Sequence, residues 1–400
     1  MLEFSKEKHN CTGCTACASV CPVNCIKMEQ DEEGFLYPVS GPECIHCGKC
    51  EDICPIKNEK KWKTEENISI QQAYCGITKD SKIWNDSSSG GAFTEICNAF
   101  GDDQTAIYGA SWYDMTVVHR RVIGPDSIAP LRKSKYIESD LNNCFSQIKK
   151  DLKDGRKVIF VGTPCEVAGL KQYIGLSTEN LLLVDLICHG VGSPKVFEAC
   201  VDALSAQYEG KVTGYEFRAK RGYHERDHLI KIELENRSEK YIVDTPFMQL
   251  FLRQDCLRPS CGMNCRYRCE YRQGDITIAD FKGLTEVFPD LIGVKKNYSS
   301  LIFNTNNGLS LLNKLKEQMV LRKCDIEFIK KYNPLFYRNT VASKNRNDFF
   351  VAFCKNPGKA IIENTCPSVI IKQNTVQKIS ARVPQPIRRS VIKIIMKIKH

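Results

Sequence analysis

Cysteine is the residue type with the most evident chemistry in this sequence, because two runs near the N-terminus space it identically. The first run reads CTGCTACASVCP from Cys11, and the second reads CIHCGKCEDICP from Cys44. Each run is C-x-x-C-x-x-C-x-x-x-C followed by proline. Thiolates at this spacing can converge on one small cube of iron and sulfide, where three of them hold three corners. The spacing therefore indicates iron–sulfur chemistry and the transfer of single electrons.

The fourth cysteine of each run lies too far round to hold the last corner of the same cube. In two-cluster ferredoxins this cysteine crosses to the other cluster. The stretch resembles a bacterial-type dicluster ferredoxin domain, so two [4Fe–4S] clusters are expected. Cys25 fills no vacant ligand place and is expected to be a small core residue rather than a ligand. The expected ligands are Cys11, Cys14, Cys17 and Cys54 for one cluster, and Cys44, Cys47, Cys50 and Cys21 for the other.

Disulfides and paired zinc knuckles are the alternatives for these cysteines. Zinc knuckles use two cysteines per run rather than four, and disulfides need an oxidising compartment. The 22 cysteines among 400 residues are fewer than a disulfide scaffold typically has. The first ten residues have no apolar core of the signal-peptide kind, and no run of about 18 apolar residues occurs. A reducing, cytoplasmic setting is therefore expected.

The net charge of +10 is unevenly distributed along the chain. No acidic residue follows Glu363, whereas eight Lys or Arg residues do. From Pro384 onward, helical spacing gathers isoleucine and valine on one side and most basic residues on the other, which is typical of a helix at an anionic membrane surface. One expectation is a tail that binds a partner or the membrane surface, peripherally on the inner face of the membrane. The other is a solvated terminus, or a helix packed on its own domain. No basic patch is evident on a folded domain, so no nucleic-acid partner is expected.

A serine- and glycine-rich stretch precedes an apolar run at residues 92–100, which predicts the start of a helix. Backbone N–H groups at such a position can hold a phosphate. On spacing alone, an ordinary helix cap with a glycine turn is the better interpretation. The residues in question are Ser88, Ser89, Gly90 and Gly91.

Two short apolar strands, at residues 158–161 and 181–187, each end in a polar loop that leads into a helix. This alternation predicts a parallel sheet covered on both faces, in which ligands lie at the C-terminal strand ends. Thr163, Cys165 and His189 are candidate site residues on these loops, although a structural turn is the commoner explanation for either loop alone. Residues 212–244 alternate in the manner of strands and predict a β-meander.

A further group of cysteines, Cys256, Cys261, Cys265 and Cys269, occurs in the C-terminal half of the chain. In a reducing compartment such a group more often binds metal than arises by chance. A third [4Fe–4S] cluster is expected here, and a structural zinc is the alternative. Cys165 and Cys188 lie on the strand-end loops and could replace one of the four.

Several motifs occur in a fixed order behind the cysteine runs: SSSGGAF, KSKYIES, VIFVGTPCEVAGL, VDLICHGVGSP, CLRPSC and GDITIADFKG. Over about residues 1–320 the chain resembles the coenzyme F420 hydrogenase/dehydrogenase beta-subunit family. This resemblance implies a bound FAD, with the serine–glycine stretch near the flavin phosphates. It also implies that Lys135, Thr163 and His189 lie near the flavin or the substrate, with Lys135 and His189 as catalytic candidates and Cys165 as a cofactor-binding one. Lys282 stands where the family usually has tryptophan.

The predicted fold class is α+β, with a ferredoxin-like domain at residues 1–60 and a linker at 61–72. An α/β flavoprotein domain follows, with a largely parallel sheet and a β-meander, in two parts at residues 73–155 and 156–345. A basic tail is predicted at residues 346–400.

The predicted function is that of an iron–sulfur flavoprotein oxidoreductase. It passes electrons between the clusters and FAD to a two-electron acceptor, which is coenzyme F420 or another organic substrate, for example in surface-polysaccharide metabolism. A redox partner protein, either a ferredoxin or an oxidoreductase subunit, is expected. The alternative is a non-catalytic electron-transfer subunit or carrier that serves a partner enzyme.

The doubled run yields a direct prediction for the N-terminal residues. Residues 1–66, isolated and reduced, should hold about eight irons and give the EPR signal of two interacting clusters. Because the fourth cysteine crosses over, Cys21→Ala should damage the cluster of Cys44, Cys47 and Cys50 rather than the nearer one. Bound zinc, or a single cluster, would contradict the assignment.

Overall fold

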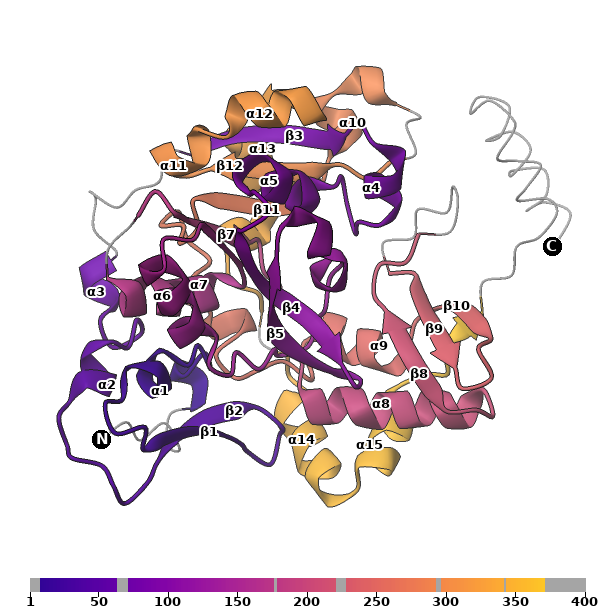
Figure 1. Cartoon of the computed structure of the whole chain (residues 1–400). Helices are drawn as coiled ribbons and strands as arrows, with labels where there is room; N and C mark the ends of the chain where they lie inside the picture. The colour runs from indigo at the N-terminus through magenta and orange to yellow at the C-terminus, as the bar shows by residue number, and fades with distance from the viewer. Residues whose placement is uncertain are drawn as a thin grey trace, which may run out of the picture.

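The computed structural model describes residues 8–62, 71–175, 178–220, 228–292, 296–341 and 343–370. They form a small N-terminal module, a core built on an eight-stranded sheet, and a four-stranded sheet beside that core (Figure 1). No helix in these described ranges is long and apolar enough to cross a membrane.

The N-terminal module is a β-hairpin with short helices beside it, and each cysteine run places one cysteine on such a helix, Cys17 and Cys50. Asp31 closes the hairpin turn, because its carboxylate accepts a hydrogen bond from the Phe35 N–H at 2.9 Å. The first of the helices packs against two helices of the core, so the module is docked directly on the rest of the chain. Its elements are α1 (Ala16–Val20), β1 (Ile26–Gln30), β2 (Leu36–Ser40), α2 (Lys49–Asp52) and α3 (Glu59–Trp62).

The eight-stranded sheet is mixed, and only its centre is parallel. The pairs β4–β6, β6–β7 and β7–β11 are parallel, whereas the remaining four pairs are antiparallel. The prediction of a largely parallel sheet is therefore wrong outside the centre, because four antiparallel pairings extend the parallel strands on both sides. In spatial order the strands are β13 (Met319–Cys324), β3 (Gln72–Thr78), β12 (Ser299–Phe303), β11 (Ile276–Asp280), β7 (Leu181–Leu186), β6 (Val158–Val161), β4 (Ala106–Tyr113) and β5 (Thr116–Ile123).

Helices cover both faces of this sheet, which explains why its central strands are predominantly apolar. Alternate residues of one strand contribute to opposite faces, as Ile107 and Tyr108 of β4 do. One face packs against α5 (Ala92–Phe100), α11 (Asn306–Leu309) and α12 (Leu312–Gln318). The other packs against α6 (Cys144–Lys153), α7 (Pro164–Ile174), α10 (Leu284–Val287) and α13 (Ile326–Tyr332).

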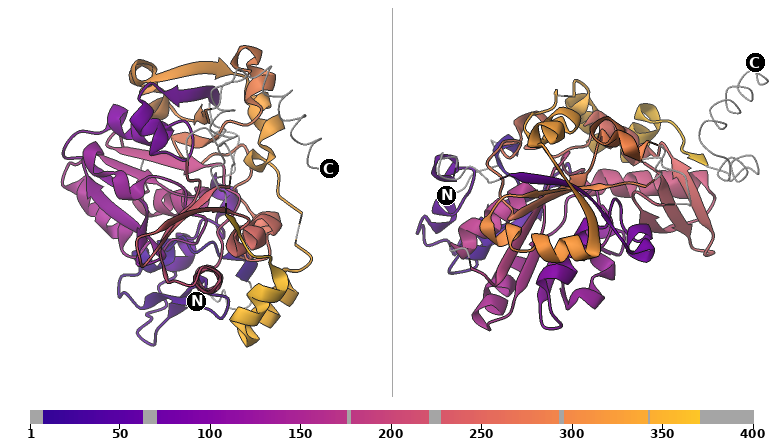
Figure 2. Two further views of the ribbon diagram at one scale, coloured as in Figure 1. Left: turned by 90° about the vertical axis from the view of Figure 1, so that its right-hand side faces the viewer. Right: turned by 90° about the horizontal axis from the view of Figure 1, so that it is seen from above.

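The predicted meander forms the four-stranded antiparallel sheet, and a cluster of aromatic rings joins it to the core. Trp112, at the end of β4, stacks on Phe217 with ring centroids 6.0 Å apart. The elements here are β8 (Val212–Glu216), β9 (Ile230–Leu234), β10 (Glu239–Val243) and β14 (Val369–Ile370), with α8 (Pro194–Gln207) and α9 (Pro246–Arg253) packed beside them (Figure 2).

The basic tail was predicted to begin at residue 346, but the described residues to 370 belong to the fold. They form α14 (Arg346–Lys355), α15 (Pro357–Asn364) and the edge strand β14. Phe349, Phe350 and Phe353 are buried in the same core cluster as the meander, which fixes this segment. The predicted amphipathic helix at 384–400 lies outside the described residues.

The glycine-rich turn before α5 is packed against the sheet. A Cβ atom at Gly90 would lie 2.4 Å from the Gly76 carbonyl oxygen and 2.6 Å from the Ser299 backbone nitrogen. Gly91 has φ +94°, in the left-handed region that favours glycine. Both glycines are thus required by close packing and by the turn that leads into the helix.

This packing predicts that Gly90→Ala lowers the free energy of unfolding by about 2 to 3 kcal/mol, because backbone atoms must move to admit the methyl group. Gly210→Ala is the control, since its nearest neighbour would be 3.7 Å away. Chemical denaturation of both variants measures the difference. Equal stability of the two variants would contradict close packing at Gly90.

Candidate functional site

The first group of thiols surrounds one small cavity in the N-terminal module, and its members come from both cysteine runs. Cys54 of the second run lies with three cysteines of the first, as the crossing pattern predicts. Burial raises the pKa of the Cys14 thiol to about 12. Buried thiols of this kind are deprotonated when a metal binds. The cavity is lined by Cys11, Cys14, Cys17 and Cys54.

The second group is more exposed and includes a neighbour that sequence reasoning assigned elsewhere. The Cys25 sulfur lies 3.5 Å from that of Cys21, and the Cys25 N–H points to the same sulfur at 3.4 Å. Cys25 also interacts with Cys44, and burial raises its pKa to about 12. Cys47 is exposed to solvent. Cys25 is buried as expected, but its thiol adjoins the expected ligands Cys21 and Cys44.

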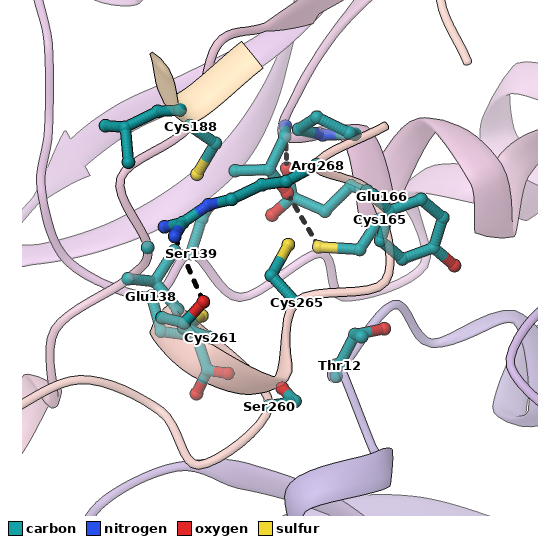
Figure 3. Close-up of a pocket in the computed structure, with 18 of the residues that line it drawn as sticks. Thr12, Glu138, Ser139, Cys165, Glu166, Cys188, Ser260, Cys261, Cys265 and Arg268 are labelled. Atoms are coloured by element: carbon teal, nitrogen blue, oxygen red, sulfur yellow. Dashed lines mark hydrogen bonds between the residues drawn. The ribbon is translucent and has the colours of Figure 1, made fainter. Parts of the chain in front are cut away.

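A third group of thiols forms what we call the thiol pocket, a cavity in the core facing the N-terminal module (Figure 3). The α7 helix begins with Pro164 and carries one of these thiols in its first turn, and a second thiol follows β7 directly. The other two flank a short 3-10 turn. The four are Cys165, Cys188, Cys261 and Cys265.

Two of the expected ligands of a third cluster do not reach this pocket. Cys256 is fully buried in the core cluster beside Cys200 of α8. The Cys269 thiol faces the carbonyl of Arg266 at 3.6 Å, within its own turn. Cys256 therefore lies apart from the pocket, whereas Cys269 packs in the same small cluster as Cys165 and Cys265 without lining the cavity. The cavity is lined instead by Cys165 and Cys188 together with the other two thiols. One of these loop cysteines was expected to replace a member of the group, and the structure places both of them in the pocket.

Burial dominates the electrostatics of the thiol pocket. Burial raises the pKa of Cys188 to about 12 and that of Cys261 to about 11, while the positive charge of Arg268 acts in the opposite direction. Arg268 is held by the His189 carbonyl at 2.7 Å and the Gly262 carbonyl at 3.0 Å. A cation is thus fixed beside thiols that are costly to ionise in the absence of a metal.

The thiol pocket adjoins the first group of cysteines without an intervening layer of chain. Thr12 and Gly13, which lie between Cys11 and Cys14, line the pocket directly. Tyr267 interacts with Cys14 and Cys54 on one side and with Cys165 and Cys265 on the other. The two thiol groups therefore lie on neighbouring cavities, with Tyr267 lining the thiol pocket.

Thr163 belongs to the thiol pocket rather than to the serine loop. It caps α7, in a capping box with Glu166, whose carboxylate accepts the Thr163 N–H at 2.6 Å. Its hydroxyl lies 3.1 Å from the Cys165 sulfur. The structure thus places two of the predicted cofactor-binding residues together at the thiols.

The serine–glycine loop is largely engaged in contacts with the protein. Ser89 donates to the Tyr298 carbonyl at 2.7 Å, and the Gly90 N–H donates to the Ser299 hydroxyl at 2.9 Å. Ser88 instead points to the neighbouring KSKYIES stretch, where its hydroxyl accepts from the Ser134 N–H at 2.9 Å. A cavity of about 460 Å³ opens beside Lys133 and Ser134. Of the four predicted residues, Ser88 contacts Ser134, which lines this cavity, and none of the four lines it directly.

Cations gather around this loop. The Lys220 ammonium donates to the Ser89 carbonyl at 2.8 Å and lies 3.7 Å from the centre of the Trp84 ring. Burial and the positive charges of Arg218 and Lys133 lower the pKa of Lys220 to about 7. Arg218 forms a 2.6 Å ion pair with Asp280. An anion at this position would relieve the repulsion among these cations.

Lys135 is buried and turned inward. Its three ammonium hydrogens are directed to three carbonyl oxygens, those of Ala110 at 2.8 Å, Arg132 at 2.7 Å and Pro130 at 3.3 Å. Burial lowers its pKa to about 7, and Lys133 adds to the effect. Because all three ammonium hydrogens are engaged by backbone carbonyls, the lysine stabilises the loop and has no free hydrogen-bond donor for a reactant. This arrangement argues against the predicted catalytic role of Lys135.

His189 follows Cys188 and lies at the C-terminal end of β7, where the sequence places a site. Its ring contacts Phe251 at a centroid distance of 4.9 Å. Burial lowers its pKa to about 4, with Arg268 and Lys282 contributing. Within the described part of the chain, its buried Nε2 atom has no hydrogen-bond partner. A buried polar atom of this kind is available to a bound group.

The module and the thiol groups define an iron–sulfur protein, and the comparisons agree. Residues 10–58 match the model of the 4Fe-4S dicluster domain. Residues 155–328 match the model for the C terminus of the coenzyme F420 hydrogenase/dehydrogenase beta subunit. The chain thus joins a dicluster domain, with its two [4Fe–4S] clusters, to the C-terminal domain of such a beta subunit, and it is an oxidoreductase. The resemblance inferred from the ordered motifs is confirmed.

A solved structure of the F420-reducing [NiFe] hydrogenase complex from Methanosarcina barkeri, obtained with xenon, is also similar. The identity is 14 %, over 73 % of this chain and 90 % of that chain, with a TM-score of 0.43. No curated protein matches the chain.

The geometry of the thiol pocket predicts a specific pattern of iron loss in the full-length protein. The holoprotein should hold about twelve irons, from three four-iron clusters. Cys261→Ser and Cys188→Ser should each lower this to about eight, because each removes a thiolate from the pocket. Cys269→Ser and Cys256→Ala, as matched controls, should leave about twelve. Metal analysis of anaerobically purified protein measures the iron content of each variant. Loss of iron in the two control variants, or zinc bound in the thiol pocket, would contradict the assignment of a third cluster.

Proposed function

We propose that this chain transfers single electrons from its N-terminal clusters, through a third [4Fe–4S] cluster in the thiol pocket, to a bound FAD that exchanges two electrons with an organic acceptor. The observation that carries this proposal is the convergence of four thiols from separate segments beside Cys14 and Cys54. Such an arrangement extends the electron path of the dicluster domain into the core.

The donor set of the thiol pocket suits an iron–sulfur cluster. Thiolate ligands favour such clusters over harder metals. Arg268 lines the pocket with the thiols, so that its positive charge would offset the negative charge of a cluster bound by thiolates. Thr163, beside the Cys165 sulfur, is placed to donate a hydrogen bond to that thiolate, which is a common means of tuning such sites.

The cations around the serine loop suit the phosphates of FAD. Ser88, Lys220 and Arg218 would hold them, with Lys133 at the mouth of the adjoining cavity. Arg218 suits phosphate because its guanidinium is always charged and planar. A bound FAD supplies the conversion between one-electron and two-electron transfer. His189, next to the thiol pocket, would present its Nε2 atom to the bound group, while Lys135 would position the loop between them.

The acceptor is coenzyme F420 or another organic two-electron acceptor, as the description of the matched domain supports. The exposed end of the module carries Cys47 and the 59 % exposed side chain of Ile45, which favours that end for contact with a redox partner protein. The same exposure would serve a flavin-free carrier, which is the second candidate function.

The proposal predicts one FAD per chain, and it predicts how binding responds to charge. Lys220→Gln should weaken FAD binding about tenfold, because a charge-assisted hydrogen bond is lost. The control is Lys79→Gln, since Lys79 also donates to carbonyl groups but lies on the surface.

The pH dependence has a definite sign. In the unbound protein the pKa of Lys220 is lowered to about 7, and a bound phosphate raises it. FAD binding should therefore be strongest below pH 7 and weaken as the pH rises above 7, and Lys220→Gln should flatten this dependence. Fluorescence titration of deflavinated protein measures both effects. If the purified protein contains no flavin and also binds none when FAD is added, the flavoprotein proposal is overturned and the electron-carrier function is favoured.

A further inference from the structure

Arg258 has the largest fully buried side chain among the described residues, with 1 % of its surface exposed. A guanidinium in such a place requires a charge partner and hydrogen bonds. It lies between Cys256 and Cys261, in the segment that contributes to the thiol pocket, yet it is not a lining residue of that pocket. Its partners explain where it points.

Three of its contacts reach the N-terminal module. The Arg258 Nε atom donates to the Cys11 carbonyl at 2.9 Å, and Nη2 donates to the Leu36 carbonyl at 2.8 Å. Nη2 also lies 3.6 Å from the Cys11 sulfur. The remaining nitrogen, Nη1, pairs with Glu138. One buried side chain thus contacts both the hairpin and the first expected ligand of a cluster.

Glu138 orients this guanidinium and contacts the module as well. Its second carboxylate oxygen accepts the Leu36 N–H at 2.8 Å. The module comes so close that a Cβ atom at Gly13 would lie 3.0 Å from both the Arg258 and the Glu138 side chains. The pair is therefore enclosed, and the guanidinium has no room to turn away from the Cys11 sulfur.

We propose that Arg258, oriented by Glu138, is a positioning residue that raises the reduction potential of the cluster bound by Cys11. A reduced cluster carries one more negative charge than an oxidised one. A fixed cation and a hydrogen bond to a ligand sulfur stabilise the more negative state. Arginine suits this role because it does not lose its proton in proteins. Arg258 is also close in the chain to Cys261 of the thiol pocket, whose N–H donates to the Arg258 carbonyl at 2.9 Å.

A purely structural link between module and core is the competing explanation, and the chain offers a matched control for it. Arg346 of α14 forms a 2.5 Å ion pair with Glu33 of the hairpin and donates to the Leu257 carbonyl at 2.8 Å. It joins the same two parts of the chain as Arg258. None of its described contacts is with a thiol of either group.

The test is an EPR-monitored potentiometric titration of the anaerobic full-length holoprotein. Arg258→Met should lower the midpoint potential of one cluster by at least 59 mV, which corresponds to a tenfold change in the equilibrium constant of its one-electron reduction. Arg258→Lys should give a smaller shift of the same sign, and Glu138→Gln a shift of opposite sign, because it removes a negative charge. Arg346→Met should leave every midpoint potential unchanged.

The inference rests on Cys11 as a cluster ligand, and the outcomes separate the two claims. Fewer than about eight irons in the wild-type protein would overturn the ligand assignment itself. Full iron content with an unchanged potential in Arg258→Met, or an equal shift in Arg346→Met, would overturn the role of Arg258 alone. If Arg258→Met loses its iron, Arg258→Lys and Glu138→Gln decide: shifts of opposite sign support the proposal, and unchanged potentials overturn it.

Discussion

The buried ion pair between Arg258 and Glu138 is the contact on which the arrangement of module and core depends. Removing either partner of a buried pair leaves an uncompensated charge, which typically costs about 3 to 5 kcal/mol. Here both partners also bind backbone atoms of the module, at Cys11 and Leu36. If the module separated from the core, the buried ion pair would lose these backbone partners in the module. The first thiol group is thereby held against the thiol pocket, and a direct electron path becomes feasible.

The sequence predicted the N-terminal module well, because its signal is local. Cysteine spacing within a run is a matter of a few residues, and the crossing of Cys54 follows from the same geometry. The third group was predicted only in part, because its members come from segments distant in sequence. Cys165 and Cys188 were recognisable from the parallel strands that end beside them. Nothing in the spacing of Cys256 and Cys269 reveals that neither of them lines the pocket.

The same distinction holds for the fold. Short apolar strands followed by helices identified the parallel centre of the sheet, since that pattern is set by burial on both faces. The antiparallel pairings of β3 with β12 and β13 were missed, because strand direction there depends on pairing between segments that are distant in sequence. Residues 346–370 were assigned to a tail on charge alone. Their phenylalanines, Phe349 and Phe353, were the sequence signal of a folded segment.

Negative charge buried at the thiol groups needs compensation, and one short segment supplies much of it. Residues 258–272 contain two thiols of the pocket together with three buried arginines, Arg258, Arg268 and Arg272. Arg272 is itself neutralised by Asp185 at 3.0 Å, whereas the Arg268 guanidinium is held by carbonyl groups. Arg268 therefore retains more of its positive charge for the thiolates, and Arg258 shares its charge between Glu138 and the Cys11 sulfur. The alternation of arginine with cysteine in this stretch is visible in the sequence, although only the structure shows which of these arginines are buried beside the thiols. Cys261 and Cys265 lie on the same short segment as these arginines, so these two thiols and the cations fold into place together, whereas Cys165 and Cys188 reach the pocket only once the parallel strands have paired.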